Sequence, residues 1–104
     1  MVEYVPPPAK NKLPPLESEF IDNEKKGKFV NDMITVATQA MTDGDAQYNQ
    51  FIYNQAHSEY LVALDGFMHL MKITKDDSNF QAYLRQKMTY LLDRVSGEQY
   101  GGSL

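Results

Sequence analysis

The most regular apolar pattern in the chain lies between residues 53 and 72, where apolar side chains recur every three or four positions. This is the period of one face of a helix, and it continues for about five turns. Leu61, Val62 and Met68 lie beside the main stripe, so this helix is expected to contact partners on more than one side. The pattern predicts the middle helix of a small bundle. Its stripe consists of Tyr53, Ala56, Tyr60, Ala63, Leu64, Phe67, Leu70 and Met71.

Similar but shorter patterns predict one helix before this stretch and one after it. The first helix is expected to begin near Asp22 or Asn23, because either side chain can cap the free amides of the first turn. It is expected to end around residues 43–45, where Gly44 can adopt the left-handed conformation of a helix C-terminus. The second helix would then extend over residues 46–73.

The third helix is predicted from Phe80 to about Val95, with Asp77 or Ser78 as its cap. No segment alternates in the way a strand requires, and no hairpin turn signal is present. The sequence therefore predicts an all-α fold, an antiparallel three-helix bundle over residues 22–96.

Both ends of the chain differ from the bundle in composition. All five prolines lie within the first 15 residues, which predicts an extended, proline-rich N-terminal leader over residues 1–21. Residues 97–104 are rich in glycine and are predicted to form a linker or tail. The segment Leu13, Pro14, Pro15 and Leu16 is apolar enough to dock in a groove, either on another protein or on its own domain.

Composition narrows the possible partners. The chain has 104 residues, a net charge of −4 and no cysteine, which predicts one domain without disulfides or cysteine-based metal sites. It lacks a basic patch with interleaved aromatic residues, so nucleic acid is not expected as a partner. No apolar run is long enough to span a membrane, so direct membrane insertion is not expected either.

Motifs for catalysis are missing as well. There is no glycine-rich phosphate loop, and His57 and His69 lack the spacing that would place two metal ligands on one helical face. Asp76 and Asp77 fall in a predicted turn, where capping is the simpler role. The sequence predicts no catalytic residue, no cofactor and no metal, and hence a protein that is not an enzyme.

The apolar positions of the second and third helices, taken together, carry a resemblance. The residues that carry the resemblance are Tyr53, Ala56, Tyr60 and Phe67, followed after a polar turn by Arg85, Lys87 and the triplet Leu92-Asp93-Arg94. In this respect the chain resembles the MIT (microtubule-interacting and trafficking) family. It is most similar to the member at the N-terminus of the vacuolar-sorting AAA ATPase of the ESCRT pathway. The resemblance covers about residues 29–96.

The resemblance implies an adaptor that binds C-terminal motifs of ESCRT-III-type subunits in two grooves. The groove between helices two and three would take a basic amphipathic helix through Tyr53, Leu92 and Asp93. The groove between helices one and three would take an extended, proline-containing strand over Met33 and Ala37. Leu13, Pro14, Pro15 and Leu16 resemble such a ligand and could occupy that groove in cis.

One departure from the family pattern weakens the first groove. The family has a glutamate where this chain has Ser96, so one ion pair to the peptide, of about 0.2–1 kcal/mol, would be missing. The resemblance further implies a monomeric domain in the cytoplasm, recruited to endosomal membranes through its partners. Any ATPase activity would belong to another domain. The alternatives are a helical scaffold or dimerisation domain without a peptide groove, and an adaptor that presents its prolines.

Overall fold

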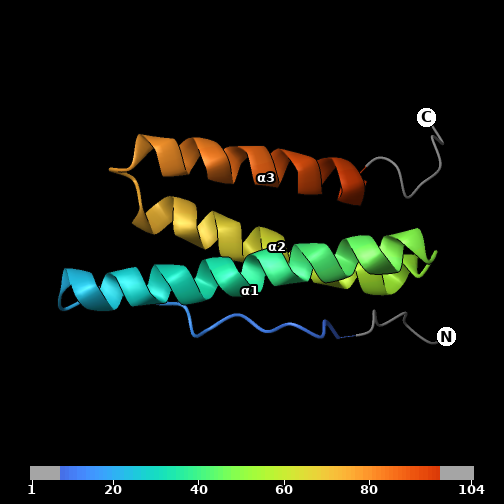
Figure 1. The fold of residues 1–104 in the computed structure, drawn as a ribbon, viewed down its shortest axis with the longest axis horizontal. Coiled ribbons are helices and arrows are strands. Elements are labelled where there is room, and N and C mark those ends of the chain that lie inside the picture. Colours follow the sequence, from blue (N-terminus) through green and yellow to red (C-terminus); the bar gives the residue numbers. More distant parts are fainter. Residues whose placement is uncertain (1–7, 97–104) are drawn as a thin grey trace, which may run out of the picture.

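A computed structural model describes residues 8–96, and within that range the chain forms three α-helices and no strand. The helices are α1 (Asn23–Asn49), α2 (Tyr53–Ile73) and α3 (Ser78–Ser96). They run antiparallel in chain order, and α2 packs against both α1 and α3 (Figure 1). The predicted three-helix bundle is confirmed. Residues 1–7 and 97–104, which include parts of the predicted leader and all of the predicted tail, lie outside the described residues.

The core consists of the apolar stripes that the sequence shows, with α2 contributing most of its residues. Tyr60 and Phe67 are the largest fully buried side chains, and both belong to α2. The buried apolar residues are Phe29, Met33, Ala37, Ala40, Ala56, Tyr60, Ala63, Leu64, Phe67, Leu70, Ile73, Leu84 and Leu91. Because α2 lies between the other two helices, it buries more than one side of its surface, as its wide apolar stripe predicted.

The predicted caps of the first and third helices are confirmed, and α3 begins at Ser78, two residues before the predicted Phe80. The Asp22 carboxylate accepts a hydrogen bond from the amide of Lys25, 2.8 Å away, and so caps α1. The Asp77 carboxylate accepts one from the amide of Phe80 at 3.0 Å at the start of α3. Asp77 therefore has the capping role that the sequence analysis gave this turn.

The predicted end of the first helix is wrong. Helix α1 continues through Gly44 to Asn49, and α2 begins at Tyr53 instead of Ala46. Gly44 is buried inside the helix, where the Tyr60 ring lies against it. The glycine is thus required for a close approach between helices and not for a left-handed turn.

Phe51 provides the left-handed residue that ends α1. Its φ is 64°. Its backbone N–H donates a hydrogen bond to the Tyr48 carbonyl, and the backbone N–H of Ile52 donates one to the Gln47 carbonyl. These two bonds form the Schellman arrangement, which usually has glycine at the left-handed position. A phenylalanine there carries a conformational cost, and its side chain is 75% exposed.

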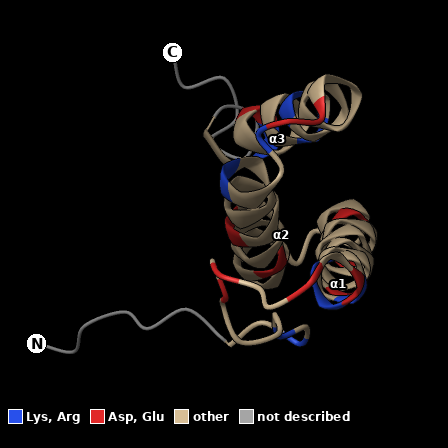
Figure 2. Ribbon diagram, turned by 90° about the vertical axis from the view of Figure 1, so that its left-hand side faces the viewer, with Lys and Arg blue, Asp and Glu red and all other residues tan. Residues whose placement is uncertain are grey.

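Residues 8–22 contain no helix or strand and run beside α1 toward its N-terminus (Figure 1). They lie across α1 and α2 on the side away from α3 (Figure 2). Among the described residues, none of the helices combines the length and apolar character that spanning a bilayer requires.

Candidate functional site

Asp45 joins all three helices at one point. Its carboxylate oxygen Oδ1 accepts hydrogen bonds from the hydroxyl of Tyr60, 2.5 Å away on α2, and from that of Tyr90, 2.8 Å away on α3. Burial and these bonds to Asp45 raise the pKa values of both tyrosines. The guanidinium of Arg94 lies 4.4 Å from the centre of the Tyr48 ring, which adds a cation–π contact between α3 and α1. This junction fixes the positions of the three helices relative to one another, and therefore the shape of the surfaces between them.

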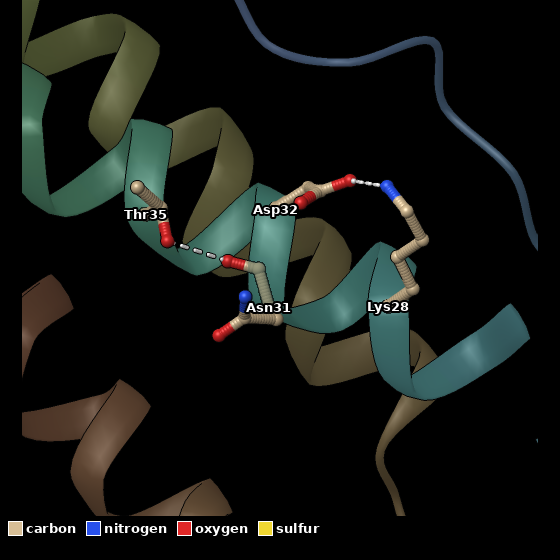
Figure 3. Close-up of polar contacts among 4 residues, drawn as sticks. All are labelled: Lys28, Asn31, Asp32 and Thr35. Carbon is tan, nitrogen blue, oxygen red and sulfur yellow. Dashed lines mark hydrogen bonds and ion pairs between the residues drawn. The ribbon is translucent and has the colours of Figure 1, made fainter. Parts of the chain in front are cut away.

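The solvent face of α1 is polar. Lys28 Nζ pairs with Asp32 Oδ2 at 3.0 Å, and the Thr35 hydroxyl donates to the carbonyl of Asn31 at 2.7 Å (Figure 3). An exposed pair of this kind contributes about 0.3–0.5 kcal/mol to stability. Lys28 and Asp32 also line a hollow of about 420 Å³ with Pro14, Pro15 and Glu17, so this part of α1 lies beside the N-terminal segment.

A different surface, between α2 and α3, exposes large apolar side chains. Leu61 and Met68 of α2 are 44% and 46% exposed, Leu92 of α3 is 51% exposed, and Met88 is partly buried between the helices and the core. Leu61 and Met68 are seven residues apart and so lie on one side of α2. We call Leu61, Met68, Met88 and Leu92 the α2/α3 face.

The register of the helices brings these side chains to one surface. The Gln81 side chain donates to the Met71 carbonyl at 3.0 Å, which places the start of α3 beside the end of α2. Leu61 lies ten residues before Met71 and Leu92 eleven after Gln81, so the two leucines are level along the antiparallel pair. Eleven residues make three helical turns, and Leu92 therefore lies on the side of α3 from which Gln81 contacts α2.

The other residues predicted for this groove lie near its end. Tyr53 begins α2, and its ring packs 5.1 Å from that of Tyr48 and 6.1 Å from that of Phe51. Asp93 is exposed, and the Ser96 hydroxyl donates to the carbonyl of Leu92 in the last turn of α3. Tyr53 thus belongs to an aromatic group at the α1–α2 turn, close to the end of α3.

Met33 and Ala37, predicted for a groove between α1 and α3, lie elsewhere. Both are fully buried, and both lie against Gly66 of α2, with Ala37 Cβ 3.0 Å and Met33 Sδ 3.6 Å from where a Cβ on Gly66 would be. Neither can contact a ligand between α1 and α3. The structure instead has a hollow of about 270 Å³ there, lined by Met41, Asp45, Gln86, Lys87 and Tyr90.

The segment 8–17 occupies the surface between α1 and α2. The buried Glu59 carboxylate accepts the backbone amide of Lys10 at 2.7 Å and that of Asn11 at 3.4 Å. The side-chain amide nitrogen of Asn11 donates to Glu59 Oε1 at 3.0 Å and to Asp43 Oδ2 at 2.8 Å. The Gln55 amide donates to the carbonyl of Pro8 at 3.0 Å.

Leu13 anchors this segment. One of its methyl groups, Cδ2, lies 3.0 Å from where a Cβ on Gly66 would be, so any larger residue at position 66 would push this methyl group away by a few tenths of an ångström. Pro14, Pro15 and the exposed Leu16 line a hollow of about 430 Å³ beside Met68 and His69. Of the four residues predicted to dock in cis, Leu13 makes the close contact, and it does so between α1 and α2.

The histidines have separate surroundings. His69 Nε2 lies 2.7 Å from the carbonyl of Glu17, and its ring meets the edge of Phe29. Residues 8–96 hold no cluster of three or more acidic, histidine or cysteine side chains that could bind a metal ion.

Glu59, Asp43 and Asp45 were not predicted from the sequence as site residues. Glu59 did carry a signal, since it is a charged residue within one turn of Ala56, Tyr60 and Ala63 on the most apolar helix. The role of Asp45 had no local signal, because its partners lie 15 and 45 residues away.

Comparison with known proteins finds no family model that matches this chain, and no significant match among curated proteins or solved structures.

Proposed function

We propose that this protein is a non-catalytic adaptor that binds an amphipathic helical peptide along the α2/α3 face. The observation that carries the proposal is that Leu61, Met68 and Leu92 are exposed on one surface between two helices. The other exposed large apolar residues lie in the N-terminal segment, at the α1–α2 turn or at Tyr83. Large apolar side chains that gather on a surface commonly mark a binding site. A helix with leucines three or four positions apart would cover this surface.

The charges beside the face are mixed, since Lys72 and Arg85 are exposed on the same sides of their helices as Met68 and Leu92, and the preference proposed for a basic peptide rests on the acidic side chains. Asp65 is exposed on α2 between Leu61 and Met68, and Asp93 is exposed beside Leu92. The whole chain is acidic, with a net charge of −4. Complementary charge speeds encounter and selects among apolar helices of similar shape.

The resemblance to the MIT family gives the partner class. The ligands proposed are the C-terminal motifs of ESCRT-III-type subunits, which are amphipathic helices rich in leucine and ending in basic residues. The protein would then act in endosomal sorting and membrane remodelling, recruited from the cytoplasm to membranes through these partners.

The test is an amide NMR titration of the full chain with a basic amphipathic-helix peptide of this type. We expect shifts at Leu61, Met88 and Leu92 that disappear in Leu92→Asp. Ile21→Asp is the matched control, because Ile21 is 87% exposed and lies outside this face, so the peptide should bind this variant normally. Analytical ultracentrifugation runs in parallel. A dimer that dissociates in Leu92→Asp, with no peptide binding, would refute the adaptor and show that a second copy covers the face.

A further inference from the structure

The surface between α1 and α2 holds an extended segment in the way that peptide-binding grooves do. Glu59 accepts two consecutive backbone amides, Gln55 donates to the carbonyl of Pro8, and the carbonyl of Glu17 is 2.7 Å from His69. All three side chains belong to α2, and their partners are main-chain groups. Contacts of this kind hold an extended chain largely independently of its side chains, while pockets select the side chains.

Two pockets are present along this segment. The first is apolar, and Leu13 fills it over Gly66 and Ala37. The second is acidic, and in it Asp43 and Glu59 share the single side-chain amide nitrogen of Asn11. The positions that fill the two pockets are two residues apart in the bound segment.

The acidic pocket is not matched to its occupant. The two carboxylates accept hydrogen bonds from neutral donors: the Asn11 amide, the Gln39 side chain at Asp43 and two backbone amides at the fully buried Glu59. Within residues 8–96, no lysine or arginine pairs with either carboxylate. The Asn11 amide carries no net charge, whereas an ammonium or guanidinium would add the Coulomb attraction of opposite charges to its hydrogen bonds with the two carboxylates. An ammonium or guanidinium in this pocket would therefore bind better than the amide of Asn11.

We propose that the groove between α1 and α2 is a second peptide-binding site, selective for an extended segment with a cationic side chain two residues before a leucine. Residues 8–17 act as its resident ligand in cis, held by a tether and not by an optimal fit. A tethered segment acts at an effective concentration of about 1 mM, so a partner peptide displaces it only by fitting the acidic pocket better. This proposal rests on residues other than those of the α2/α3 face, apart from Met68, which lies beside Pro14 and Leu16.

The test uses the full chain and two fluorescent synthetic peptides of residues 8–17. One peptide has the natural sequence, and the other has α,γ-diaminobutyrate in place of Asn11, which puts an ammonium at the position of the Asn11 amide nitrogen. Fluorescence anisotropy should show the cationic peptide binding about tenfold more tightly. In the chain with Leu13→Ala, which weakens the resident segment, both peptides should bind more tightly and keep this ratio.

Charge-removing variants identify the pocket. Glu59→Gln and Asp43→Asn keep side-chain size and an acceptor oxygen. In these variants, the ratio of the two peptide affinities should fall from about ten toward one. Leu92→Asp should leave both affinities unchanged, since it lies on the α2/α3 face. The proposal is refuted if neither peptide binds to the Leu13→Ala chain at about 1 mM. It is also refuted if the two peptides bind equally, or if Leu92→Asp abolishes binding.

Discussion

Replacing Gly44 by alanine is expected to destabilise the fold, whereas the same change at Gly27 in the same helix is expected to stabilise it. A Cβ at Gly44 would lie 2.7 Å from Cε1 and 2.8 Å from Cδ1 of the Tyr60 ring. Carbon atoms prefer to be about 3.5–4.0 Å apart, so the ring would have to move by about 0.8 Å. A Cβ at Gly27 would meet nothing within 4 Å.

The Tyr60 ring has little freedom to move. It is fully buried, and its hydroxyl is held 2.5 Å from Asp45. Overpacking of this kind costs about 1–3 kcal/mol, and loss of a hydrogen bond to a carboxylate costs about 1.5–3 kcal/mol more if the ring shifts far enough to break it. Against this stands the gain of about 1 kcal/mol from alanine's higher helix propensity. With the middle of each range, the net loss for Gly44→Ala is about 1 kcal/mol if the hydrogen bond to Asp45 holds and about 3 kcal/mol if it breaks.

Gly27→Ala has only the favourable contribution, and a gain of about 0.5–1 kcal/mol in the free energy of unfolding is expected. Thermal unfolding followed by circular dichroism measures both variants. One kcal/mol shifts Tm by about 4–8 °C in a domain of this size, so the two variants should move in opposite directions by readily measured amounts. The close packing of α1 on Tyr60 would be refuted if Gly44→Ala were as stable as the unchanged protein while Gly27→Ala behaved as expected.

Three further predictions concern the helix ends and the three-helix junction. Asp22→Ala should lower the free energy of unfolding, measured by urea denaturation, by about 1 kcal/mol because the α1 cap is lost. Ser18→Ala, an exposed change before the helix, should have little effect. Equal losses in the two variants would argue against the cap. Phe51→Gly should raise Tm, because glycine adopts a positive φ without the cost of about 1 kcal/mol that phenylalanine has, and an unchanged or lower Tm would contradict this. Burial and the bonds to Asp45 raise the pKa values of Tyr60 and Tyr90. Their contribution to the free energy of unfolding is therefore fully present below the pKa of an unfolded tyrosine, about 10, and decreases as the pH rises above that value. Phenolate absorbance should show two tyrosines that ionise at higher pH than the others, and a single transition near the ordinary pKa would refute the junction.

Part of the candidate site could be predicted from sequence and part could not. The exposed position of Leu92 was expected from the resemblance to the MIT family, because periodicity alone indicates only that Leu91 and Leu92 cannot both point into the core. The placement of Ala37 did not follow, since a small residue on an apolar stripe can line a groove or allow close packing equally well. Only the approach of Gly66 on α2 decides that Ala37 is buried.

By itself, the sequence indicated three helical segments, most of the face that each buries, and the two turns whose aspartates cap α1 and α3, because these depend on periodicity and on contacts three or four residues apart. Tertiary structure alone decided where α1 ends. Gly44 can end a helix or allow a close contact within one, and the Tyr60 ring, 16 residues later in the chain, fits only the second role. Tertiary structure also made Glu59 a buried acceptor, since the amides that it binds are 48 and 49 residues away. Partners so distant along the chain leave no local pattern, and only the packed structure brings them together.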